Sequence, residues 1–219
     1  GPGGKGHGAR GSTKDLFARV PVLGALYRET LACQGLSSVL SVMFFRRLTE
    51  TVPDDAERAG WTGKFYAATN LVSGTMQFGV LPFVMGRIDP AWIWRSMPVI
   101  MAVLAAAQCM HPDPPLKLVA MAFLAMKGME YSVRGVVNEM VYVPLDFESR
   151  YVGKEVIGVF AYRLGKSGTS LALSAASAVF GDVGLRDLSM LTAAAAATWC
   201  GTAWRLADLL PGKEGGGAD

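Results

Sequence analysis

The sequence predicts an all-α membrane protein with six transmembrane helices, half of a major-facilitator-like transporter fold. Hydrophobic residues make up 51% of the chain and charged residues only 18%, against roughly 25% charged residues in soluble domains. The mean hydropathy is +0.31. Uncharged stretches recur that approach the roughly 20 apolar residues of a membrane-crossing helix. A soluble domain would have to bury all of them in one small core, so we set that alternative aside.

The six spans can be justified in chain order. They are predicted at about 20–45, 65–86, 91–110, 116–142, 155–180 and 185–206. The first ends at Arg46-Arg47, and the polar stretch 51–64 that follows is predicted to be an interfacial loop. The second is uncharged throughout. The third follows Asp89-Pro90, a helix-start signal, and its first turn carries tryptophans, as helices do at a membrane interface.

The fourth predicted span carries polar residues on one face. Lys127, Glu130, Arg134 and Asn138 are spaced i, i+3, i+7 and i+11, which places them on one side of a continuous helix that Pro144 ends. Carboxylates within a membrane normally pair with cations. We therefore expect Glu130 to pair with Arg134 or Lys127.

The fifth predicted span combines a stripe of small residues with two cations. The stripe is Gly158, Ala161, Gly165, Gly168, Ala172 and Ala175. Its spacing of three and four residues predicts a face on which another helix packs closely. Arg163 and Lys166 lie roughly opposite. For Lys166 two interpretations stay open. It either forms an anion site in a transport pathway, or its side chain reaches the membrane interface or pairs with Glu130. For Arg163 we favour a side chain that reaches the interface.

Catalytic and nucleic-acid functions find little support. Gly165, Lys166 and Ser167 end like a phosphate-binding loop, but Phe160 stands where that motif needs glycine, and no strand precedes it. No nucleophile–base set and no metal-ligand spacing is visible. The net charge of +3 without a basic, aromatic run argues against nucleic-acid binding. We expect no enzyme, no catalytic residues and no metal.

The stretch NEMVYVPLDFESRYVGKEVIGVFAYRLGKSGTSL, 138–171, resembles the signature region of the ATP/ADP translocase family of plastids and intracellular bacteria. The shared features are the block from Glu139 to Asp146, the pair Gly153-Lys154, and the Arg-x-Gly-Lys-Ser-Gly sequence that starts at Arg163. Weaker similarity upstream extends the resemblance over most of 25–206. It implies the C-terminal half of a carrier that exchanges ATP for ADP, with Lys166 on a family cation.

The sequence departs from the family pattern at the membrane-embedded acid and next to the signature. Ser41 stands where the family has glutamate in the first helix of this half, and Asn138 stands where it has lysine. The resemblance thus implies a site with one cation kept and its acidic counterpart replaced.

From these features we predict an integral membrane scaffold or accessory subunit of a larger organellar complex, a photosynthetic one if the organelle is a plastid. The alternative is exchange of ATP, ADP or another nucleotide, by a homodimer or with a separate second half. The candidate substrate contacts are then Lys166, Arg163, Arg134, Glu130 and Asn138. Expected partners are other membrane subunits and the lipid bilayer. No cofactor is predicted, although lipids or pigments could lie at the periphery; ATP or ADP belongs to the alternative.

The chain divides into a membrane domain and two terminal segments. We predict a Gly-rich basic extension at 1–19, the six-helix domain at 20–209 and a Gly-rich tail at 210–219. The basic extension lacks acidic residues until Asp15, which favours an organellar membrane, with the plastid envelope or thylakoid preferred.

Overall fold

The computed structural model describes residues 13–181 and 183–210, and each regular element in this part is helical. The all-α class is therefore confirmed. In chain order the elements are α1 (Thr13–Arg19), α2 (Pro21–Thr51), α3 (Asp55–Gly74), the π-helical turn η1 (Thr75–Val80), α4 (Leu81–Met85), α5 (Pro90–Cys109), α6 (Leu116–Tyr131), α7 (Val133–Tyr142), α8 (Phe147–Glu155), the π-helical turns η2 (Val156–Ala161) and η3 (Leu164–Gly168), α9 (Thr169–Phe180) and α10 (Leu185–Ala207). The predicted terminal segments lie mostly outside the described residues, and 13–19 form α1.

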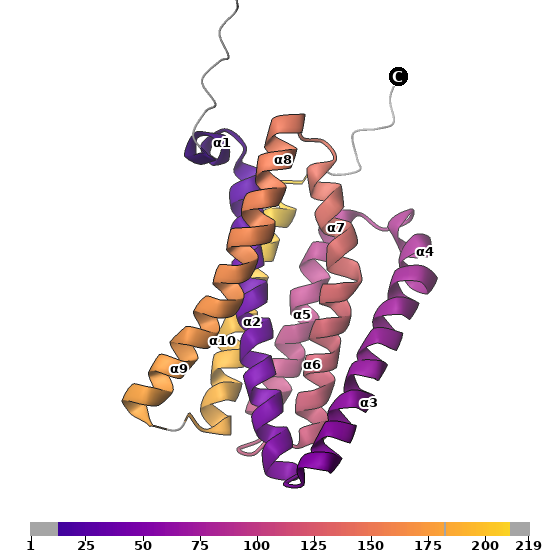
Figure 1. Ribbon diagram of the computed structural model, residues 1–219. Coiled ribbons are helices and arrows are strands. Elements are labelled where there is room, and N and C mark those ends of the chain that lie inside the picture. Colours follow the sequence, from indigo (N-terminus) through magenta and orange to yellow (C-terminus); the bar gives the residue numbers. More distant parts are fainter. Residues whose placement is uncertain (1–12, 182, 211–219) are drawn as a thin grey trace, which may run out of the picture.

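After α1, the described elements join into six rods that match the six predicted spans in order. The rods are α2, α3–η1–α4, α5, α6–α7, α8–η2–η3–α9 and α10 (Figure 1). Among the described helices, α5 alone is both long enough and apolar enough to cross a membrane by length and composition. For the other five rods, membrane crossing stays a prediction.

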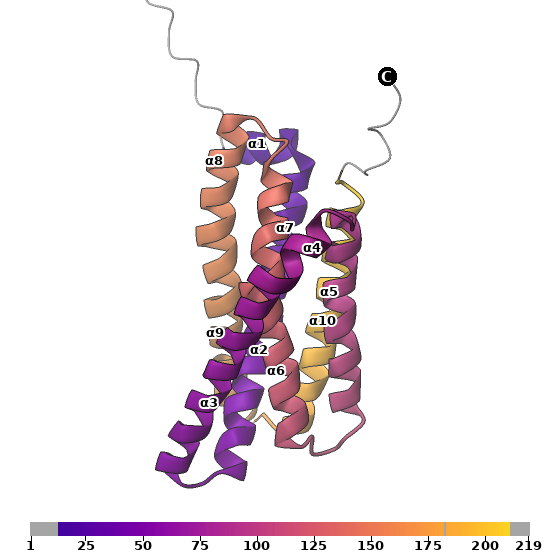
Figure 2. The ribbon, with the colours of Figure 1, turned by 90° about the vertical axis from the view of Figure 1, so that its right-hand side faces the viewer.

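The rods are arranged in three layers. In Figure 2, α3 and the α8–α9 rod lie on one side, α2 and α6–α7 in the middle, and α5 and α10 on the other side. The middle helix α2 contacts α10, α6, η3, η2 and α9, while α10 also packs along α5. Because α2 touches most of the other rods, polar side chains on it can meet partners from several directions.

The predicted interfacial loop at 51–64 is wrong for most of its length. The carboxylate of Asp54 accepts a hydrogen bond from the amide of Glu57 at 2.8 Å and begins α3 at the next residue. Trp61 and Phe65 then pack on Phe44, with ring centroids 5.7 and 4.6 Å away. Aromatic packing against α2 therefore favours a helix where polar composition predicted a loop.

The fourth predicted span is broken in the middle. Ser132 has φ −117° and ψ −81°, and its hydroxyl donates to the carbonyl oxygen of Gly128 at 2.5 Å. A serine bonded back to its own helix often bends it. The four polar residues of this span therefore lie on two helix segments, α6 and α7, rather than on one continuous face.

The predicted small-residue stripe of the fifth rod lies partly on the face that this rod buries. The residues buried on this rod recur every fourth position, at Gly153, Ile157, Ala161 and Gly165, because π-turns close i→i+5 and are wider than α-turns. Of the predicted stripe, Gly158, Ala172 and Ala175 are exposed and Gly168 is half-buried.

Gly165 is the point of closest approach between this rod and α2. A Cβ atom added there would stand 2.7 Å from the Cβ of Gln34 and 3.0 Å from the carbonyl oxygen of Leu31. Contacts under about 3 Å are not tolerated without movement, so glycine is required for η3 to touch α2.

Large apolar side chains are exposed on the outer surface. Phe78, Val103 and Leu171, on three different rods, are 79, 64 and 71% exposed. Extended apolar surfaces of this kind are typical of contact with a membrane or with another protein.

Candidate functional site

A group of buried polar residues lies on the central helix α2. Glu29, Thr30, Gln34, Ser37 and Ser38 are all buried. Buried polar groups need hydrogen-bond partners, and here the partners come from other rods. They fall into two clusters about two turns apart along α2.

In the first cluster, Glu29 accepts hydrogen bonds from two other helices. Arg134 of α7 reaches its two carboxylate oxygens through Nε at 3.3 Å and Nη2 at 2.7 Å. The indole Nε1 of Trp199, on α10, donates to the same carboxylate at 2.7 Å. Glu29 is fully buried. The predicted substrate contact Arg134 is thus held by an internal ion pair that connects α2, α7 and α10.

In the second cluster, Glu130 is paired with Lys127. The Nζ atom of Lys127 lies 2.8 Å from Oε2 of Glu130 and 3.0 Å from the hydroxyl of Ser37. Gln34 donates to the other carboxylate oxygen of Glu130 at 3.0 Å. Of the two pairings expected for Glu130, the structure has the one with Lys127; Lys166 makes no ion pair with it.

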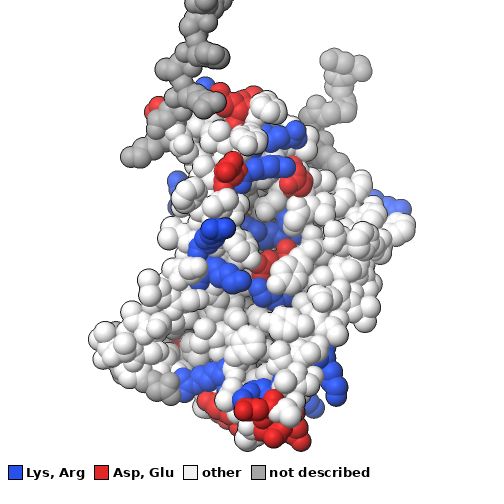
Figure 3. Space-filling model, viewed as in Figure 1, with Lys and Arg blue, Asp and Glu red and all other residues white. Residues whose placement is uncertain are grey.

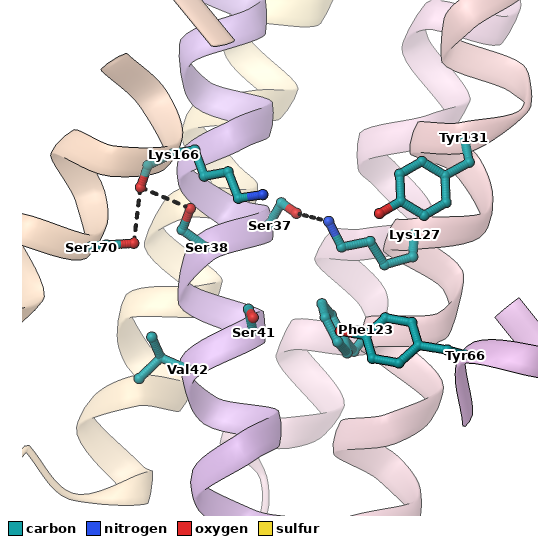
Figure 4. A pocket seen from close by; sticks show the side chains of 10 residues that line it. All are labelled: Ser37, Ser38, Ser41, Val42, Tyr66, Phe123, Lys127, Tyr131, Lys166 and Ser170. Carbon is teal, nitrogen blue, oxygen red and sulfur yellow. Dashed lines mark hydrogen bonds between the residues drawn. The ribbon is translucent and has the colours of Figure 1, made fainter. Parts of the chain in front are cut away.

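A cavity of about 160 Å³ borders this second cluster. Figure 4 shows the ammonium groups of Lys127 and Lys166 on opposite walls, both directed toward Ser37. Further polar side chains line it, namely Ser38, Ser41, Tyr66, Tyr131 and Ser170. Because Glu130 neutralises Lys127, the cavity carries one uncompensated positive charge, that of Lys166, among the groups described here.

The backbone of Lys166 is fixed to α2. Its carbonyl oxygen accepts hydrogen bonds from the hydroxyls of Ser38 at 3.2 Å and Ser170 at 3.0 Å. Its ammonium group lies 5.9 Å from the ring centroid of Tyr162. The π-turn η3 thus directs a cation to the cavity while Gly165 lets the turn approach α2.

The space-filling view shows the same region from outside. In Figure 3, Lys, Arg, Asp and Glu side chains gather in a hollow at the middle of a largely uncharged face. Lys166 is exposed in this hollow, and cations bind phosphate oxygens through short charge-assisted hydrogen bonds. The arrangement therefore suits a phosphate-bearing ligand.

The remaining predicted contacts lie elsewhere. Arg163 is exposed in a separate, mainly apolar groove beside Phe160 and Leu164. Asn138 and Arg134 line a neighbouring cavity of about 330 Å³. Of the five predicted contacts, only Lys166 lines the smaller cavity, and Glu130 supports its wall through Lys127.

Sequence reasoning missed other members of the site. It recorded Lys127 only as a partner for a carboxylate, and it passed over Glu29, Ser37 and Tyr131. The serines at 37, 38 and 41 were a usable signal, because they fall on one side of an apolar helix. Ser41, where the resemblance expects an acid, lines the cavity; Glu130 supplies the carboxylate instead.

Similarity to known proteins covers much of the chain. Residues 116–206 match the family described as TLC ATP/ADP transporter, whose carriers are membrane proteins. ADP,ATP carrier protein 1 of Chlamydia trachomatis is 26% identical over 69% of this chain and 32% of its own length. The same-named protein of Chlamydia pneumoniae is 25% identical over 83% of this chain and 39% of its own.

A rickettsial relative gives a shorter match. ADP,ATP carrier protein 5 of Rickettsia prowazekii is 28% identical over 48% of this chain and 18% of its own length. The chain therefore spans at most about two fifths of these curated relatives. No solved structure matches it.

Proposed function

Since the chain is a distant relative of the TLC ATP/ADP transporters, we propose that it is one six-helix half of a carrier that exchanges ATP and ADP or related nucleotides. A second copy, or a separate half, supplies the opposite wall of the transport pathway. Carriers of this type alternate access by moving one half against the other around a central site. The relation to transporters also confirms the expectation that the chain is not an enzyme.

The observation that carries this proposal is Lys166, a cation without an ion-pair partner among the described residues, facing a polar cavity. A cation inside a membrane costs about 3 kcal/mol on insertion scales. Lys127, on the opposite wall of the cavity, is neutralised by Glu130 at 2.8 Å. A carrier for polyphosphates needs a charge that the ligand itself neutralises, and Lys166 supplies it.

The scaffold role predicted from the sequence takes second place. Its sequence support included a continuous docking stripe on the fifth rod, and part of that stripe, Ala161 and Gly165, is buried within the chain itself. The relatives are named as carriers. The organellar location, plastid envelope or thylakoid, stays a prediction from the N-terminal composition.

Exchange in proteoliposomes tests the proposal. Vesicles containing the purified chain and loaded with ADP should take up labelled ATP. Lys166→Ala removes one charge-assisted contact worth about 1.5–3 kcal/mol, so we expect uptake at subsaturating ATP to fall by about 10- to 150-fold. Arg163→Ala is the matched control, because it removes a cation from the same rod outside the cavity, and it should exchange normally.

Measuring ATP binding distinguishes a chain that binds nucleotide but lacks its second half from a chain that does not bind nucleotide at all. In detergent, ATP should raise the unfolding temperature of the wild-type chain and of Arg163→Ala, but not of Lys166→Ala. A folded wild-type chain that shows neither exchange nor stabilisation by ATP would favour the scaffold role. Equal exchange by the two variants would remove Lys166 from the site.

A further inference from the structure

We propose that the cavity next to the Lys166 site is the compartment for the nucleoside, and that Asn138 contacts the base. This inference rests on the proposed function, since it takes the ligand of Lys166 to be a nucleotide. It adds a residue that determines specificity and divides the ligand between two neighbouring spaces.

The cavity beside Lys166 is too small for a whole nucleotide, so such a ligand must extend into a second cavity. At about 160 Å³ the space beside Lys166 falls below the roughly 300–1,000 Å³ of typical small-molecule sites. It can hold phosphoryl groups but not a whole nucleotide. The neighbouring cavity, at about 330 Å³, is twice as large.

The two cavities share no lining residue, but one pair of neighbouring side chains connects them. Tyr162 lines the larger cavity, and the ammonium group of Lys166 lies 5.9 Å from the centroid of its ring. Along α2, Thr30 faces the larger cavity and Ser37 the smaller one. Seven residues of α-helix rise about 10 Å, a separation that the ribose and phosphates of a nucleotide can span.

Asn138 has an unused hydrogen-bond acceptor. Its Oδ1 atom is buried and has no partner among the described residues, although the residue lines the larger cavity. Buried acceptors without a donor are rare and costly. The amide of asparagine offers one acceptor and one donor side by side, the pattern that matches the amino group and N7 of adenine.

The charges of the larger cavity suit a neutral group. Arg134 is neutralised by Glu29 at 2.7 Å, and Lys154, at the rim, by Glu139 at 2.6 Å. In contrast to the Lys166 site, the described ion pairs here leave no net charge. Phosphates therefore favour the smaller cavity, and the base favours this one.

Calorimetric titration of the purified chain with ATP, GTP and pyrophosphate tests the division. Asn138→Ala should lower the preference for ATP over GTP by about 5- to 150-fold, the range for one bidentate base contact. It should leave pyrophosphate binding unchanged, since pyrophosphate has no base. Lys166→Ala should weaken all three ligands.

A second variant tests the space itself. Nothing lies within 4 Å of the position that a Cβ atom would take at Gly135, so Gly135→Leu can fold and fill the larger cavity. It should reduce binding of both nucleotides while pyrophosphate still binds. An unchanged ATP-to-GTP ratio in Asn138→Ala, or equal losses for pyrophosphate, would overturn the inference alone. A folded wild-type chain that binds none of the three would overturn the proposed function with it.

Discussion

The two charged clusters on α2 use the same residue types to opposite effect. Around Glu29, the carboxylate is fully buried and receives hydrogen bonds from Arg134 and Trp199, while Arg134 also lines the larger cavity. Around Lys127, a comparable ion pair borders a cavity, and Lys166 brings a further charge that nothing described neutralises. The first cluster connects three helices, and the second leaves a charge available for a ligand.

The difference shows what separates a structural charge from a functional one. Both ion pairs lie deep in the bundle, so burial alone does not distinguish them. What distinguishes them is the charge balance of the cavity that each borders: Arg134 lines a cavity whose described ion pairs leave no net charge, whereas the cavity beside Lys127 also receives Lys166. Four variants, taken in order of expected effect, test this distinction.

Stability should be most sensitive to the loss of the Glu29–Arg134 ion pair. Glu29→Gln leaves the guanidinium of Arg134 buried without a counter-charge, a change that typically costs about 3–5 kcal/mol. We expect a large fall in the unfolding temperature in detergent. Replacing both residues, by Glu29→Gln with Arg134→Met, should recover most of the stability. Wild-type stability in the single variant would show that the pair does not hold the helices together.

Breaking the Lys127–Glu130 ion pair should cost less stability, and an anionic ligand should restore part of that stability. Glu130→Gln removes the charge opposite Lys127, and we expect a cost of about 1.5–3 kcal/mol, the range for a hydrogen bond to a charged group. Pyrophosphate in the cavity can replace that charge, so it should raise the unfolding temperature more in Glu130→Gln than in the wild type. It should not rescue Glu29→Gln. Equal responses of the two variants would erase the distinction between the clusters.

The contact between η3 and α2 should tolerate no added side chain. Gly165→Ala places a Cβ atom 2.7 Å from that of Gln34, and overpacking of this kind costs about 1–3 kcal/mol. Gly168→Ala is the control, since its Cβ atom would meet only Leu164, at an ordinary 3.8 Å. Thermal unfolding should separate the two, and matching losses would argue against a specific contact at Gly165.

The exposed ion pair should matter least. Lys154 and Glu139 lie 2.6 Å apart, but their side chains are 41 and 63% exposed, and such pairs contribute about 0.2–1 kcal/mol. Glu139→Gln should shift the unfolding temperature only slightly, and less at high salt. A loss of stability as large as that of Glu29→Gln would mean that burial does not determine how much an ion pair contributes to stability.

The sequence predicted the rods well because the signals were local. Uncharged runs and breaks at Pro53, Asp89-Pro90 and Pro144 located the six rods in order, although α2 extends to Thr51 and the fifth rod begins at Phe147 rather than at 155. It failed at 55–64, where the packing of Trp61 and Phe65 on another helix outweighed polar composition.

The site was harder to predict because its contacts are distant in sequence. Lys166 could be found from a cation in an apolar span. The partner of Arg134, however, lies 105 positions away at Glu29, and only residues on the same helix were considered as its partners. The buried face of the fifth rod differs from the predicted stripe because the prediction assumes α-helical turns, whereas η2 and η3 are π-helical.

Those π-turns also give the fifth rod a way to twist. A π-turn holds an additional residue compared with an α-turn, and one residue of α-helix corresponds to about 100° of rotation and 1.5 Å of rise. Rewinding Leu164–Gly168 into α-helical register would swing the Lys166 amine sideways out of the cavity. In the proposed half-carrier, such a local change of winding would withdraw this charge while α2 stays in place.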